Sequence, residues 1–357
     1  MKTKLLFLML PITFLCCTRG VKNVSVRKPV DTIGFATKQY QIDSVMSRIM
    51  SLQGEMLAKS PTVNGCRLAV CPHDDYTYVG WLYPATLRNI SAKTIILFGV
   101  AHKARKFNLE DALVFDSFTH WHGAYGNIPV SELREHIIKE MPGDMAIRYD
   151  SMHIVEHSVE SMLPFLQYSK RDIEIVPILV PSMSFDRMKE VATALATALQ
   201  KVFQKYDLNW GSDVALVVTT DAVHYGDEEW GGRNYAPFGT DSAGYRKAVD
   251  LELEIINTTL KGTLNDVKIR NFFGYTVDAE NYREYKWTWC GRYSIPFALL
   301  TAIKLNQLMK GSDLIGLPVG YATSIDHQPL PVADLGMGQT APANIRHWVG
   351  YAAVVYP

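Results

Sequence analysis

The chain has 357 residues, of which 48% are hydrophobic and 20% are charged, and its formal net charge is zero. This composition is typical of a globular protein with a large apolar core. Because the chain has neither a basic excess nor a basic run, we expect no nucleic-acid partner.

The N-terminal residues have the pattern of an export signal. Lysines at the start precede a short apolar run over residues 5–15, and Cys16 and Cys17 follow that run. The run is too short for a membrane-spanning helix, which needs about 20 residues. Cysteines in this place are typical of a bacterial lipoprotein, with Cys17 as the lipidated residue, and a plain cleaved signal peptide is the alternative. We expect a lipoprotein-type signal peptide over residues 1–17. The protein would then be exported to the periplasm or cell surface, with a lipid anchor as its only membrane contact.

Behind this signal, the chain alternates apolar strands with amphipathic helices. Residues 18–35 are polar and mixed, as in a tether, and a single domain is expected over residues 36–357. Helical spacing of apolar residues predicts helices within residues 37–59, 81–90, 131–139, 158–168, 188–206, 243–259, 264–273 and 295–310. Apolar runs predict strands at residues 67–71, 94–100, 112–115, 128–130, 173–180, 214–218 and 349–355. This alternation predicts an α/β fold, a three-layer sandwich around a mixed, mostly parallel sheet.

Two histidines stand just beyond the ends of predicted strands. His73 follows the strand at residues 67–71, and His102 follows the strand at residues 94–100. In open α/β sheets, ligands bind beyond the carboxyl ends of the strands, so both imidazoles are expected at that edge. If the Cys290 thiol joins them, the three side chains form a metal site. The alternative is that each histidine only caps or packs a strand end.

The cysteines behind the leader are few. Cys66 and Cys71 lie five residues apart on one predicted strand, and therefore face opposite sides of it. A disulfide between them is not expected, and Cys290 is then a free thiol, which needs a reason in an exported protein.

Two further polar segments are expected at or near the same edge of the sheet. Asp221 and His224 come after the strand at residues 214–218 and are expected at the same edge, where they could transfer protons. The alternative is a loop capped by Asp221. His157 precedes a predicted helix that Ser158 could cap, which would direct His157 into the crevice; a plain helix start is the alternative.

Together, these segments resemble the Memo family, called AmmeMemoRadiSam system protein B in bacteria. The matching segments occur in family order: Pro72–Tyr76, Gly99–Lys103, Glu156–Phe165, Val176–Val180, Thr219–Gly226, Cys290–Arg292 and Gly350–Ala353. The resemblance implies an α/β fold shared with class III extradiol dioxygenases, which hold Fe(II) with two histidines and a carboxylate. In the Memo family, a cysteine takes the place of that carboxylate.

Carried over residue by residue, the resemblance implies metal ligands and a supporting set of polar residues. The implied ligands are His73, His102 and Cys290. The implied acid–base or supporting residues are Asp221, His224 and His157. Imidazole and thiolate ligands suit iron, copper or zinc, with iron and copper as our first expectation.

The chain departs from the family pattern in three places. Asp74 and Asp75 replace Ala-Gly beside the first histidine, and either one ligates the metal or both face solvent. Lys103 replaces a second histidine and could bind an anionic substrate group. Residues 228–233 look inserted, and we interpret them as a surface loop rather than a lid.

Three functions remain open from the sequence. The first is a metal-dependent redox enzyme or oxygenase acting on a small-molecule or peptide substrate. The second is a non-catalytic module that binds a peptide or a partner protein in the same crevice, since fold does not determine function. The third is a metal-assisted hydrolase with His224 as the base.

Overall fold

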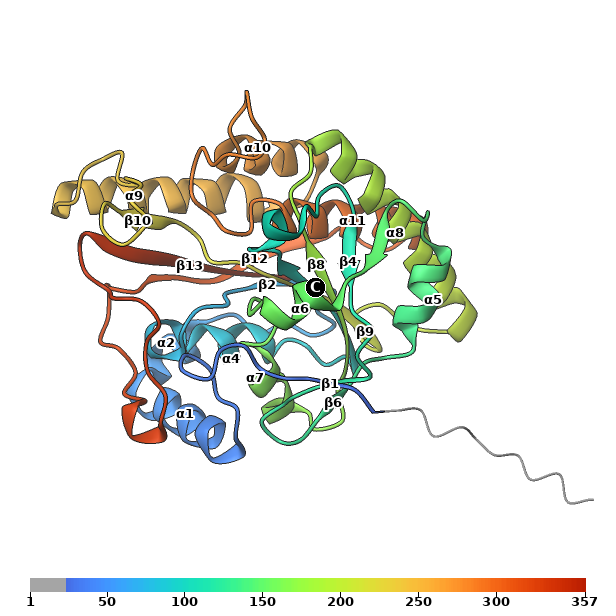
Figure 1. Ribbon diagram of the computed structural model, residues 1–357, viewed down its shortest axis with the longest axis horizontal. Helices are drawn as coiled ribbons and strands as arrows, with labels where there is room; N and C mark the ends of the chain where they lie inside the picture. The colour runs from blue at the N-terminus through green and yellow to red at the C-terminus, as the bar shows by residue number, and fades with distance from the viewer. Residues whose placement is uncertain (1–23) are drawn as a thin grey trace, which may run out of the picture.

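The computed structural model describes residues 24–357 and places one large mixed sheet between two layers of helices (Figure 1). The expected signal peptide at residues 1–17 and the lipidation site at Cys17 lie outside the described residues. Within residues 24–357, no helix combines the length and apolar character needed to cross a bilayer.

The large sheet has ten strands in the order β11-β12-β13-β2-β9-β3-β8-β4-β7, with β10 paired to β13, and β1, β5 and β6 form a separate small sheet. The strands are β1 (Val26–Arg27), β2 (Leu68–Cys71), β3 (Thr94–Val100), β4 (Leu113–Phe115), β5 (His120–Trp121), β6 (Ile128–Pro129), β7 (Ala146–Arg148), β8 (Glu174–Val180), β9 (Val214–Thr219), β10 (His224–Gly226), β11 (Gly262–Thr263), β12 (Ile315–Thr323) and β13 (His347–Tyr356). Strands β2, β9, β3 and β8 pair in parallel at the centre of the sheet. Antiparallel pairs flank them on both sides.

The helices cover both faces of the sheet. They are α1 (Gln39–Leu52), α2 (Gly54–Lys59), α3 (Tyr76–Val79), α4 (Leu82–Leu87), α5 (Leu133–Glu140), α6 (Asp150–Val155), α7 (Leu163–Ser169), α8 (Phe185–Tyr206), α9 (Ser242–Ile255), α10 (Asp266–Thr276) and α11 (Ser294–Met309). Short turns of other helix types are η1 (Ala104–Phe107), η2 (Ile256–Leu260) and η3 (Ala333–Leu335). In Figure 1, α8 to α11 lie on one side of the sheet and α1, α2, α4 and α7 lie on the other.

Strand alternation explains why the sheet carries two separate cores. Leu68 and Val70 of β2 belong to the cluster that includes α8 and α11, whereas Ala69 and Cys71 belong to the opposite cluster. Successive side chains of a strand point to opposite faces, so each central strand contributes to both cores. The three-layer α/β sandwich expected from the sequence is confirmed, around a mixed sheet that is only partly parallel, with its parallel strands at the centre.

The described part of the expected tether packs on the domain instead. Strand β1 pairs with β5, and the Arg27 side chain, 2% exposed, forms an ion pair with Glu160. Phe35 is also buried, at 3% exposure. Composition suggested a tether because residues 18–35 mix polar and apolar side chains without a periodic pattern, but Arg27 and Phe35 are both buried against the domain.

Two local expectations also need correction. Helix α7 begins at Leu163, so Ser158 does not cap it; the Ser158 hydroxyl donates to the carbonyl of Val100 instead. Cys66 lies before β2 and packs in the same core as Cys71, so strand alternation does not apply to this pair. Both thiols are free, as is that of Cys290.

Candidate metal centre

The carboxyl ends of three adjacent central strands bring the predicted polar residues together. His73 lies two residues beyond β2, His102 two beyond β3, and Asp221 two beyond β9. Because β2, β9 and β3 are parallel neighbours, these side chains emerge at one edge, as strand position predicts.

Glu156 orients His102. Its Oε1 atom lies 2.9 Å from His102 Nδ1, and its Oε2 atom accepts the His102 backbone N–H at 2.8 Å. The backbone N–H groups of His157 and Ser158 also donate to Glu156 Oε1. Burial alone would lower the pKa of His102, but the Glu156 carboxylate outweighs it, and the pKa is raised. With Nδ1 donating to the carboxylate, the Nε2 lone pair of His102 is free for a ligand.

His73 is buried, with 1% of its surface exposed. Its Nδ1 atom lies 3.1 Å from the Thr219 hydroxyl, and its backbone N–H donates to Asp221 Oδ1 at 3.1 Å. The Nε2 atom lies 3.3 Å from Asp221 Oδ2 and 3.4 Å from Cys290 Sγ. Burial lowers the pKa of His73 to about 3, so the ring is neutral, which is the form that binds metals.

Cys290 reaches this edge because its segment packs closely on the end of β9. Its sulfur accepts the Asp221 backbone N–H at 3.0 Å. A Cβ atom at Gly291 would lie 2.2 Å from the Thr220 hydroxyl, so only glycine permits this approach. Burial, aided by Asp221, raises the pKa of the Cys290 thiol well above its usual value. A metal ion that binds here would therefore displace the thiol proton.

The potential ligand atoms form two groups that share His73. In one group, the ligand atoms of His73, His102 and His157 all lie within 4.8 Å of one another. In the other, those of His73, Asp221 and Cys290 do so. The structure thus places His102 and Cys290 each in a group with His73, but neither group contains all three expected ligands. It also adds His157 and Asp221 as neighbouring donors.

The three residues expected to transfer protons surround these groups. Asp221 Oδ2 lies 3.9 Å from His224 Nε2, so the carboxylate stands between His73 and His224. His157 stacks on His102 with ring centroids 4.9 Å apart, and burial lowers the pKa of His157 to about 4. The indole of Trp230 stacks on His224 at 5.2 Å. The loop at residues 228–233 therefore packs over the site.

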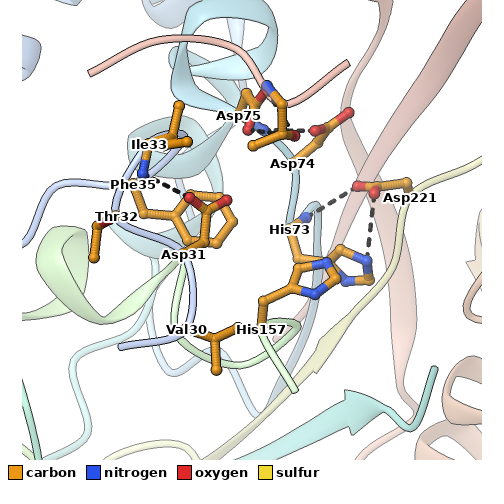
Figure 2. A pocket seen from close by; sticks show the side chains of 11 residues that line it. Val30, Asp31, Thr32, Ile33, Phe35, His73, Asp74, Asp75, His157 and Asp221 are labelled. Atoms are coloured by element: carbon orange, nitrogen blue, oxygen red, sulfur yellow. Dashed lines mark hydrogen bonds and ion pairs between the residues drawn. The ribbon is translucent and has the colours of Figure 1, made fainter. Parts of the chain in front are cut away.

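A cavity of about 370 Å³ opens beside His73 and His157. Figure 2 shows the Val30–Phe35 segment on one side of this cavity, with Asp74 and Asp75 near the start of α3. Four of its lining residues are acidic and none is Lys or Arg; the acidic residues are Asp31, Asp74, Asp75 and Asp221. The segment predicted to be a tether is therefore a wall of the cavity.

The residues that differ from the family pattern, Asp74, Asp75 and Lys103, have hydrogen-bond partners within the protein. Asp74 Oδ2 accepts from the Tyr351 hydroxyl at 2.6 Å, and Asp75 accepts from the backbone and side chain of Thr340. Neither carboxylate belongs to a group of close ligand atoms among the described residues. The Lys103 ammonium donates to the Val155 carbonyl at 2.8 Å, which fixes its position beside His102.

A second, smaller cavity of about 100 Å³ also borders the ligand groups. Both His102 and Cys290 line it, together with the buried guanidinium of Arg292 and the ring of Tyr285. The ligand groups thus border two cavities, one lined by acidic residues and one by arginine and aromatic residues.

Sequence reasoning missed the role of Glu156. The residue was part of a matched segment, but its position before His157 suggested only a helix start. A carboxylate that precedes a cluster of histidines is the signal that could have identified it, because ligating imidazoles commonly donate to such a partner.

The fold and this edge define an α/β sandwich with a candidate transition-metal centre at the ends of its parallel strands. A sequence model of the family described as Memo-like protein matches residues 38–329, which is most of the chain. The protein therefore belongs to the Memo-like family, as its motifs indicated.

The chain is also similar to curated relatives. It is 30% identical over 177 residues to a MEMO1 family protein of Pyrococcus furiosus, which covers 47% of this chain and 55% of that protein. It is 28% identical over 212 residues to one of Pyrobaculum arsenaticum, covering 57% and 70%, respectively. A relative of Aquifex aeolicus is 29% identical over 160 residues, covering 43% and 52%. The matches thus span from about half to 70% of the relatives' length.

Proposed function

We propose that this protein binds a redox-active metal ion, iron or copper, through His73, His102 and Cys290. We propose further that it uses this ion in a redox or oxygenase reaction on a small-molecule or peptide substrate. One observation carries the proposal. Both histidines engage Nδ1 with an oxygen atom, Glu156 Oε1 or Thr219 Oγ1. The His102 Nε2 atom is then left for a ligand, and the His73 Nε2 atom faces two further donor atoms, Cys290 Sγ at 3.4 Å and Asp221 Oδ2 at 3.3 Å.

The donor chemistry fits such an ion. Neutral imidazoles suit iron, copper and zinc, and a thiolate favours copper, zinc or thiolate-ligated iron. Carboxylate partners on ligating histidines fix the tautomer and raise ligand basicity, and Glu156 supplies this for His102. A bound iron or copper ion would supply one-electron redox chemistry.

The surrounding residues have separate roles in this proposal. Asp221 holds the backbone of His73 and stands next to His224, so this pair would move protons to and from substrate. His157 lines the larger cavity and is neutral at pH 7, so it would accept a proton or a hydrogen bond from substrate. Trp230 on His224 would limit the access of water to this pair.

The test is metal binding by the full-length protein after anaerobic reconstitution with Fe(II), Cu(I) and Zn(II) in parallel. We expect one metal ion per chain, with loss of binding in H73A and weakened binding in C290S. H136A is the matched control, because His136 lies on the surface and bonds to Tyr206. Absence of bound iron, copper and zinc from the wild type would refute the proposal.

Turnover would then separate the reaction classes. We expect oxygen consumption with an oxidisable substrate by the iron- or copper-loaded protein, and its loss in H224A with metal content unchanged. Hydrolysis of a substrate without dioxygen would identify a metal-assisted hydrolase instead.

A further inference from the structure

A buried carboxylate lies directly behind the candidate metal centre. Glu252 of α9 is fully buried, at 0% exposure. Its Oε1 atom accepts hydrogen bonds from the indole Nε1 atoms of Trp287, at 2.5 Å, and Trp289, at 2.6 Å. Its Oε2 atom accepts the backbone N–H of Val223 at 3.0 Å. One carboxylate thus satisfies three N–H donors from two distant segments of the chain.

Two of these donors are neighbours of site residues. Val223 directly precedes His224 and follows Asp221 by two residues, whereas Trp289 directly precedes Cys290. Glu252 therefore connects the turn that carries the acid–base pair to the segment that carries the thiol. No atom of Glu252 bonds to a proposed ligand, so any effect on the centre passes through Val223 and Trp289.

The strand behind the turn leaves room for this carboxylate. Gly350 of β13 exchanges backbone hydrogen bonds with the turn, donating to the Val223 carbonyl at 2.8 Å and accepting from the Ala222 N–H at 2.7 Å. A Cβ atom at Gly350 would lie 2.9 Å from Glu252 Oε2 and 2.9 Å from the Tyr321 hydroxyl oxygen. A larger residue would therefore push the carboxylate away from Val223.

A purely structural role does not explain this arrangement well. Within residues 24–357, Glu252 forms no salt bridge with a lysine, arginine or histidine. Burying a carboxylate without a cationic partner is costly, and apolar packing generally stabilises a core better. What the carboxylate adds is a defined distance between two segments, because three directed hydrogen bonds fix both of them to one group.

We infer that Glu252 is a positioning residue of the metal centre: it holds Cys290 in register with Asp221 and His224 through the Trp289 indole and the Val223 backbone. The metal aspect of this inference rests on the proposed function. Its geometric aspect, the placement of the Cys290 thiol, is measurable in the metal-free protein.

The experiment compares Glu252→Gln with Asp116→Asn in the full-length protein. Asp116 is also fully buried and accepts from an indole, that of Trp121, at 2.6 Å, but it pairs with Arg134 away from Cys290. Both variants thus lose a buried carboxylate that accepts from a tryptophan. A glutamine at position 252 has one acceptor oxygen in place of two, so at least one of the three N–H donors loses its partner.

The first measurement is the rate of Cys290 alkylation by iodoacetamide in metal-free protein, followed by peptide mass spectrometry. We expect a rise of about tenfold or more in E252Q and none in D116N, because the loss of a buried hydrogen bond makes local opening of the Cys290 segment easier. The buried thiols of Cys66 and Cys71 report global opening in the same sample, and they should stay unreactive.

The second measurement is Co(II) binding, followed by the thiolate-to-cobalt absorption band. We expect E252Q to weaken Co(II) binding by about 10–100-fold and to change the band, with D116N like the wild type. If E252Q and D116N behave alike in both measurements, Glu252 is only structural and the inference is wrong. Absence of Co(II) binding by the wild type would count against the proposed metal site. The alkylation rates of Cys290 would still test the positioning role of Glu252, because they are measured without metal.

A third variant keeps the test decisive if E252Q does not fold. Trp289→Phe removes only the indole donor that links Glu252 to Cys290. We expect Cys290 to be alkylated faster in W289F than in the wild type. If the double variant W289F/E252Q folds, its alkylation rate should be little higher than that of W289F. Equal rates in W289F and wild type would overturn the proposed route through the indole.

Discussion

Replacing Glu156 by glutamine is expected to weaken metal binding more than it weakens the fold. The Glu156 carboxylate is buried, at 2% exposure, and accepts four N–H groups, one from the His102 ring and three from the backbone. The glutamine amide can place its oxygen at only one of the two carboxylate positions. Its amino group then faces at least one N–H donor, which is left unpaired.

The size of both effects follows from these contacts. If the amide oxygen takes the Oε1 position, only the His102 backbone N–H loses its partner, and the free energy of unfolding falls by about 1–3 kcal/mol. Metal affinity is expected to fall by about 10–100-fold, because the His102 ring then donates to a neutral amide oxygen in place of an anion. This loss corresponds to about 1.4–2.8 kcal/mol of binding free energy.

The matched control is Glu160→Gln, four residues further along the chain. Glu160 is also buried, at 6% exposure, and accepts backbone N–H groups, but its ionic partner is Arg27. Denaturant unfolding measures the stability of both variants, and Co(II) titration of the folded proteins measures affinity. If the two variants lose similar amounts of stability and their Co(II) affinities also agree within about twofold, His102 does not ligate the metal through Nε2.

Three further outcomes are expected. Burial raises the pKa of Glu252 from 4.5 to about 7, so this group should cost the wild type on the order of 3 kcal/mol of stability as the pH rises from 4.5 through 7. Denaturation at several pH values should therefore show a steeper fall in stability for the wild type than for E252Q, in which only the other buried carboxyls, such as Asp75, contribute. Trp230→Ala should remove the stacking on His224 and His347, worth about 0.5–1.5 kcal/mol per pair, and speed His224 modification by diethylpyrocarbonate. Cys17→Ser should release the protein from the membrane fraction if a lipid on that cysteine anchors it; an unchanged distribution would contradict the lipoprotein assignment.

The sequence predicted those parts of the fold that depend on local pattern. Strands β3 and β8 are continuous apolar runs, and α8 has apolar residues at helical spacing, so each appears where the pattern places it. Strand β12 was missed because Gly316, Pro318 and Gly320 interrupt its pattern. Its pairing with β13 even shifts register between Pro318 and Gly320. Such a strand depends on its neighbour in the sheet, which no local pattern reveals.

The site was predictable to the extent that strand ends determine position. His73, His102 and Asp221 each follow a parallel central strand, so their proximity follows from topology alone. The partners of these residues were not predictable in the same way. Glu156 reaches His102 from a turn between α6 and α7, and Glu252 reaches Val223 and Trp289 from the last turn of α9. Their roles depend on tertiary packing, which places a buried polar group opposite its donors.

The N-terminal segment shows how packing can reverse an interpretation based on composition. Residues 18–35 have no periodic apolar pattern, yet Arg27 forms a buried ion pair with Glu160, and its guanidinium also donates to the carbonyls of His153 and Glu156. Removing one partner of a buried pair typically costs about 3–5 kcal/mol, so this anchor holds the segment firmly. Since the carbonyl of Glu156 is one acceptor, the anchor connects the cavity wall to the residue that orients His102. Arg27 contacts only the backbone carbonyl of Glu156, whereas the Glu156 carboxylate contacts His102, so the anchor fixes the cavity wall to this turn without touching the groups that orient His102.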